Sequence, residues 1–183
     1  MVAATPLLLA LLQAAASPAP APAAVTDCSA PAHGQFDFWI GDWDVVPNGA
    51  PQTPGRKPSR NTVTKIQSGC VSHENWQAAT NTGESFNIYD RTRDKWHQTW
   101  VDSGGGLQEF WGGLKDGNMV YEGTAPPPKG QTVGERTRMT FFNLAPGKVR
   151  QLVERSSDGG KTWKVQYDFA YTRKAASATA SAQ

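Results

Sequence analysis

The residues best suited to chemistry are polar side chains that alternate with tryptophans in two short segments. In an extended Trp96–Trp100 segment, Gln98 shares a face with both tryptophans and His97 lies on the other face. Glu74 shares a face with Trp76 in the same way. Aromatic rings interleaved with a few polar groups are typical of a cavity that binds a small, largely apolar molecule.

We therefore predict a ligand site in which rings supply apolar contact and polar groups orient the ligand. The predicted site residues are Glu74, Trp76, Trp96, Gln98, Trp100, Trp111 and Arg138. The same rings would also suit a solid core, because tryptophan is highly buried on average. The leading functional hypothesis is non-enzymatic binding of a small, largely apolar ligand.

Carboxylates on predicted inward faces support a second hypothesis, an enzyme. Glu74, Glu109 or Glu154 could act as a general base on a small ester or an isomerisable substrate if burial raised its pKa. Pairing with Arg136 or Arg138 would remove that role. No Gly-x-Ser-x-Gly sequence is present, and no catalytic residue is assigned. A third hypothesis is an envelope protein with a solid interior that acts through its surface.

Composition and charge exclude several classes of protein. The 183 residues include 10% aromatics, which indicates a folded globule, and the net charge is only +2. Lysine and arginine form no cluster longer than two residues, so no nucleic-acid partner is predicted. No apolar run reaches the roughly 18 residues of a membrane-spanning helix. The oligomeric state is left open.

The N-terminal region is typical of a targeting segment. Its first 26 residues carry no charged side chain, and the apolar stretch Leu7–Leu12 is followed by small residues suited to signal peptidase. We predict a signal peptide and an Ala/Pro linker over 1–26, and a periplasmic or secreted location. Cys28 and Cys70, the only two cysteines, are then predicted to form a disulfide, with two buried free thiols as the alternative.

Proline placement indicates where the strands lie. All 13 prolines fall in the leader or in four connecting stretches, and the segments between are rich in aromatic and β-branched residues. The predicted strands are 38–46, 59–67, 71–76, 85–89, 96–101, 107–111, 118–122, 135–143, 148–155 and 162–173. In the last of them, strict alternation places Trp163, Val165, Tyr167, Phe169 and Tyr171 inside.

The predicted architecture is all-β, since no helical periodicity follows the leader. Ten short strands joined by short turns predict one antiparallel meander over 27–174, followed by a disordered tail at 175–183. Closure into a barrel would remove exposed strand edges. A two-sheet sandwich is the alternative.

Gly41-Asp42-Trp43 resembles the Gly-x-Trp opening of lipocalin-like (calycin) barrels. The resemblance implies that Trp43 closes one end of the barrel and meets a basic residue of the last strand, here Arg173. Together with Cys70, Trp96–Asp102, Ser156–Trp163 and the closing Tyr171-Thr172-Arg173, this opening resembles a family of exported bacterial proteins of unknown function with a lipocalin-like barrel. The resemblance covers roughly 28–173 and implies a fold and export, without a reaction.

Other motifs have structural explanations. Ser156–Trp163 fits the Asp-box of sialidase-like propellers, but one copy predicts only a hairpin turn capped by Asp158. His33, His73 and His97 form no metal-ligand spacing. Haem-binding barrels of the nitrobindin kind share Gly-x-Trp, yet their further glycines are absent here. No metal and no cofactor are predicted.

Overall fold

The computed structural model describes residues 1, 28–51, 55, 57–125 and 134–175. The predicted signal peptide and linker lie outside the described residues except for Met1, as does the predicted tail from residue 176. Two short 3-10 helices, η1 (Pro31–Gly34) and η2 (Asp37–Trp39), precede the strands. The strands are β1 (Gly41–Pro47), β2 (Ser59–Ile66), β3 (Val71–Gln77), β4 (Thr82–Asp90), β5 (Lys95–Asp102), β6 (Leu107–Lys115), β7 (Asn118–Thr124), β8 (Arg136–Ala145), β9 (Lys148–Ser156) and β10 (Lys164–Arg173).

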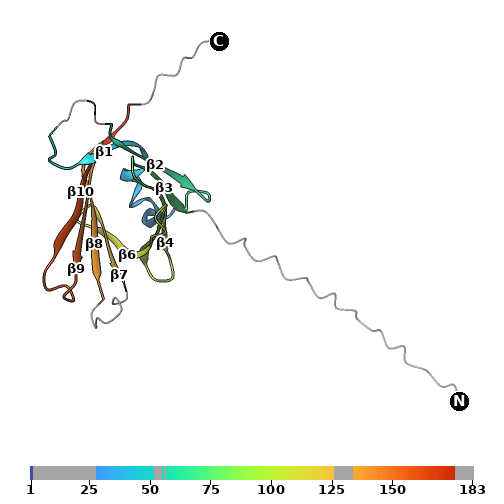
Figure 1. Ribbon diagram of the computed structural model, residues 1–183. Helices are drawn as coiled ribbons and strands as arrows, with labels where there is room; N and C mark the ends of the chain where they lie inside the picture. Colours follow the sequence, from blue (N-terminus) through green and yellow to red (C-terminus); the bar gives the residue numbers. More distant parts are fainter. Residues whose placement is uncertain (2–27, 52–54, 56, 126–133, 176–183) are drawn as a thin grey trace, which may run out of the picture.

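The strands form a closed barrel. Each pairs antiparallel with the next along the chain, and β1 pairs with β10. Figure 1 shows β7 to β10 facing β2 to β4 across a common interior. The predicted ten-stranded meander of the lipocalin-like type is therefore confirmed, and the sandwich alternative is wrong. Closure leaves no unpaired edge strand in the described part of the chain.

Two details of the predicted strands are wrong. Residues 38 and 39 belong to η2, and Phe36, just before this helix, stacks on Trp39 with 4.8 Å between ring centroids. In β10, a register shift between Val165 and Tyr167 interrupts the alternation. Val165 is consequently 63% exposed, and Trp163 lies before the strand on the outer surface, whereas the later aromatic residues face inward.

One end of the barrel is filled with aromatic side chains, and we call it the closed end. Trp39 lies fully buried there against Phe141, with 4.6 Å between ring centroids. The guanidinium of Arg173 lies 4.4 Å from the Trp43 ring and donates to the carbonyl oxygens of Ile40 and Phe38. This arrangement matches the role that the Gly-x-Trp resemblance implies for Trp43 and Arg173.

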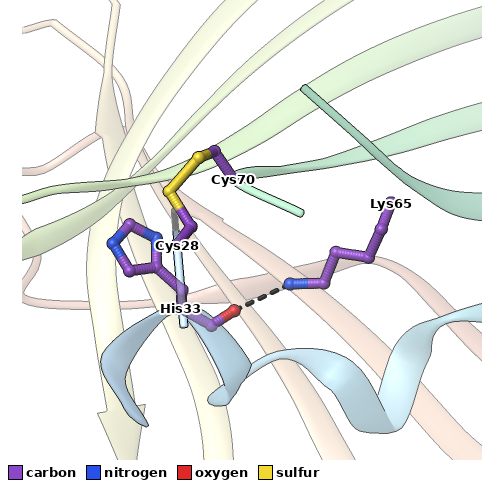
Figure 2. The surroundings of a disulfide bond; sticks show 4 residues. All are labelled: Cys28, His33, Lys65 and Cys70. Carbon is purple, nitrogen blue, oxygen red and sulfur yellow. Dashed lines mark hydrogen bonds between the residues drawn. A yellow bond between two sulfur atoms is a disulfide. The ribbon is translucent and has the colours of Figure 1, made fainter. Parts of the chain in front are cut away.

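A disulfide holds the leading segment against this end. Cys28 and Cys70 are bonded, with 4.9 Å between their Cα atoms, as predicted. Figure 2 shows the bond beside η1, where Lys65 Nζ donates to the carbonyl oxygen of His33 at 2.7 Å. Because Cys70 immediately precedes β3, the bond fixes η1 and η2 to the barrel wall.

The direction of the strands defines the opposite end. In a closed antiparallel meander all odd-numbered strands run the same way, so the connections that follow them emerge at one end. The described ends of β1 and β7, which lead into the two long proline-containing stretches of the sequence, lie there. The closed end lies where the even-numbered strands finish, as Arg173 at the end of β10 shows.

Candidate functional site

The barrel interior contains a cavity of about 260 Å³ toward the end opposite the closed one. Small-molecule sites usually measure about 300–1,000 Å³, and a cavity of about 150 Å³ can hold benzene, so this one suits a ligand with a single substituted ring. Its lining consists of Glu74, Trp76, Asn81, Gln98, Trp100, Asp102, Gln108, Phe110, Met139, Gln151, Tyr167, Phe169 and Tyr171.

Strand alternation arranges the lining in layers. Along β5 the inward residues are Trp96 in the closed-end core, then Gln98, then Trp100. Along β3, which runs in the same direction, Glu74 precedes Trp76. Polar groups therefore form the floor of the cavity and aromatic rings form its walls. We call the solvent-facing rim at Asn81, Asp102 and Gln108 the mouth.

Glu74 supplies the carboxyl group of the floor. It is 4% exposed, and its carboxyl accepts hydrogen bonds from Asn61 Nδ2 at 2.9 Å and Ser85 Oγ at 2.6 Å. Desolvation raises the pKa of Glu74 to about 7, although these two hydrogen bonds and the nearby His73 act in the opposite direction. The carboxyl therefore changes its protonation near neutral pH.

A network of buried amides and hydroxyls supports this carboxyl. Asn87 Nδ2 donates to Ser85 Oγ at 2.9 Å and thereby orients the hydroxyl toward Glu74. Asn87 Oδ1 accepts from Gln98 Nε2 at 2.8 Å and from the Tyr121 hydroxyl at 3.3 Å. Such a network fixes the floor geometry before any ligand arrives.

Asp102 provides a second carboxylate, at the mouth. It accepts hydrogen bonds from Trp100 Nε1 at 3.1 Å and from the backbone N–H groups of Gly104 and Gly106 at 2.8 and 3.0 Å. These hydrogen bonds hold the pKa of Asp102 below its usual value, and the one from the Gly106 backbone has the largest effect. Asp102 is therefore negatively charged at neutral pH.

Four of the predicted site residues meet at the cavity. Glu74, Trp76, Gln98 and Trp100 all line it. Trp96 also faces inward but does not line the cavity, because it lies one layer deeper. There its Nε1 donates to Gln35 Oε1 at 3.0 Å, beneath the segment that fills the closed end.

Trp111 does not face inward as predicted. It packs outside the wall against His97, with 4.1 Å between ring centroids, and beneath Arg93. The prediction assigned the alternation of β6 to the wrong face, because Phe110 faces inward and Trp111, the next residue, faces outward.

Arg138 also lies on the outer wall. It donates twice to Glu154 at 2.8–2.9 Å and covers the Trp163 ring at 4.5 Å. Glu154 is therefore ion-paired outside the barrel, and Glu109 lies outside near His97. Of the three carboxylates predicted to face inward, only Glu74 does so.

Several residues in and around the cavity were not predicted from the sequence. Gln151 stands between the buried Val149 and Val153, a pattern like that of Gln98 between two tryptophans. Asn61 and Ser85, which hold Glu74, likewise alternate with buried or small residues on their strands. For Gln151, a polar residue on an otherwise apolar strand face was the available signal, whereas the inward face of β4 also carries the polar Asn87.

The remaining motifs have structural roles. Asp158 accepts hydrogen bonds from the backbone N–H groups of Lys161 and Thr162, both at 2.9 Å, so the Asp-box forms the predicted capped turn. His73 pairs with Glu84 on the outer wall, and His33 is buried beside the disulfide. Within the described ranges, no three His, Cys, Asp or Glu side chains gather where they could hold a metal ion.

Comparisons of the sequence with family models and with curated proteins give no match. No model of a protein family fits the sequence, and no curated protein is significantly similar to it. Neither helical turn in the described part of the chain is long and apolar enough to cross a membrane. The resemblance to an exported family therefore stays a prediction, and function has to be inferred from the cavity itself.

Proposed function

We propose that the protein binds a small, largely apolar molecule with a single ring in the barrel interior, without chemical change. The observation that carries this proposal is the cavity of about 260 Å³, in which aromatic walls stand above a polar floor. Trp76 and Phe169 stack with 5.7 Å between ring centroids, and Tyr167 stacks on Phe169 at 4.8 Å. These rings give a flat ligand apolar contact, while Glu74 and Gln98 are placed to orient its polar group.

The proposal is tested with two matched substitutions on adjacent strands. Trp100→Phe changes a ring of the cavity, whereas Trp111→Phe changes a ring of the outer wall. We expect Trp100→Phe to weaken the binding of neutral probes such as toluene and phenol about three- to tenfold, because a lost aromatic contact is worth about 0.5–1.5 kcal/mol. Trp111→Phe should leave their affinity unchanged.

Affinity is measured by fluorescence titration, and the indole N–H signals in NMR spectra report which rings a probe touches. The signals of Trp76 and Trp100 should shift with probe concentration, whereas that of Trp111 should not. The proposal fails if the folded protein binds no single-ring probe, or if both substitutions weaken binding equally.

A second candidate function, acid–base catalysis, is favoured by Glu74 itself. Its pKa of about 7 and its position on the cavity floor suit a general base for an isomerisable carbonyl compound. Ser85 is not a candidate nucleophile, because it is fully buried and does not line the cavity. If this candidate is right, turnover should show an inflection near pH 7 that Glu74→Gln abolishes. Equal rates in both proteins would exclude it.

We further propose that the protein works outside the cytoplasm, in the periplasm or secreted. The Cys28–Cys70 disulfide supports this location, because such bonds persist in oxidising compartments. Recovery of the chain from the cytoplasm with both thiols reduced would contradict it.

A further inference from the structure

The charges around the cavity distinguish between classes of ligand. We infer that the preferred ligand is a small organic cation, an amine or quaternary ammonium compound carrying one ring. This inference rests on the proposed binding function and names the chemistry of its ligand. It depends on three features of the cavity: the sign of its charged side chains, the neutral hydrogen-bonding partners of the floor carboxyl, and the aromatic walls.

The charged groups that line the cavity have one sign. Glu74 lies on the floor and Asp102 at the mouth, and no Lys, Arg or His is among the lining side chains of the described residues. Arg138 and Arg150 lie on the outer wall, where they pair with Glu154 and Asp168. Arg155 follows the inward-facing Val153 by two residues at the mouth end of β9, but it pairs with Glu135 and does not line the cavity. Among the lining side chains, an anionic ligand would therefore meet two carboxylates and no cation.

Among the described residues, the floor carboxyl has no cationic hydrogen-bonding partner. Asn61 and Ser85 donate neutral hydrogen bonds to Glu74, and a buried carboxylate without a countercharge is costly. A ligand cation in the cavity would supply that countercharge and favour the ionised form. Gln98 donates to Asn87, and its own carbonyl oxygen has no partner among the described residues, so it can accept from an ammonium group.

The walls suit the same kind of ligand. The faces of tryptophan, tyrosine and phenylalanine rings attract cations, by about 2 kcal/mol or more where water is excluded. Trp76, Trp100 and Tyr167 line the cavity together with Phe169. A positively charged ligand is therefore attracted both by the aromatic rings of the walls and by the carboxylate of the floor.

Proton release gives the inference a second readout. Near neutral pH a cation that stabilises ionised Glu74 should expel its proton. The titratable groups around this carboxyl are His73 on its own strand and the hydroxyls of Tyr121, Tyr167 and Tyr171 across the barrel. The pKa values of the three tyrosines are raised, mainly by burial, so these hydroxyls stay protonated and the released proton comes from Glu74.

The test compares three ligands of similar size but different charge. Benzylamine, benzyl alcohol and benzoate are titrated into the full mature protein at pH 8 by calorimetry. We expect benzylamine to bind about tenfold more tightly than benzyl alcohol, and benzoate to bind most weakly. At pH 6.5, titrations in two buffers of different ionisation enthalpy should show proton release with benzylamine alone.

Two carboxylate substitutions serve as a matched pair. Glu74→Gln should remove most of the preference for benzylamine and the proton release, while Glu109→Gln, on the outer wall, should change neither. Asp102→Asn at the mouth should also lower the affinity for benzylamine. This variant provides a second test if Glu74→Gln does not fold. Equal or tighter binding of benzyl alcohol or benzoate would overturn the inference and leave the binding function standing. Failure of all single-ring probes, neutral ones included, would overturn both.

Discussion

Replacing Gly112 with alanine is expected to destabilise the barrel by about 4 kcal/mol, an unusually large effect for one added methyl group. Gly112 pairs with Trp96 on one side and with Tyr121 on the other. A Cβ atom at this position would overlap the carbonyl oxygen of Val120 and lie 2.8 Å from the Tyr121 Cα. Both neighbours are backbone, so the strands themselves would have to separate.

The next residue supplies the control for this prediction. A Cβ atom at Gly113 would meet no heavy atom within 4 Å. Gly113→Ala should therefore leave stability unchanged or raise it by up to about 1 kcal/mol, because it restricts the unfolded chain. Urea unfolding of both variants measures the difference. Similar stabilities would show that β7 does not need its close approach to β6.

The second large effect concerns the pH dependence of stability. The pKa of Glu74 rises from 4.5 to about 7 on folding, mainly through desolvation. Below pH 4.5 the carboxyl is protonated in both states, and its stabilising contribution is complete. Between pH 4.5 and 7 it ionises in the unfolded chain while it stays neutral in the barrel. The free energy of unfolding should thus fall by about 3 kcal/mol across this window and level off above it.

Comparison with Glu74→Gln isolates this contribution. His33 changes the free energy of unfolding in the opposite direction as the pH rises, because burial lowers its pKa and the folded state favours the neutral ring. The wild-type curve minus the Glu74→Gln curve removes that contribution and those of the surface groups. Glu109→Gln should run parallel to the wild type, since this side chain is exposed. Parallel wild-type and Glu74→Gln curves would mean that Glu74 is ionised in the folded barrel at pH 5 to 7.

The sequence was sufficient for the architecture because the barrel depends on local signals. Prolines and glycines between β-rich segments located all ten strands, and the two cysteines identified the disulfide. The alternation in β3 and β5 placed Glu74, Trp76, Gln98 and Trp100 inside. These strands are regular, so a period of two holds along their length.

Errors arose where that period was interrupted or its phase was ambiguous. The register shift in β10 turned Val165 outward, and no residue in that segment marks the shift. In β6 both Phe110 and Trp111 are large and aromatic, so composition did not show which of them faces inward. The hydrogen-bonding partners of Glu74 come from β2 and β4, and that contact depends on interstrand register, which one sequence does not contain.

The filled end of the barrel also determines how any occupant exchanges with solution. Trp39 and Trp43 seal one end, and the disulfide fastens the segment that carries the seal. Among the described residues, the cavity is blocked at this end and reaches solvent at the mouth, beside Asp102 and Trp100. If the protein binds a ligand as proposed, the side chains at the mouth should therefore set the rate at which that ligand dissociates.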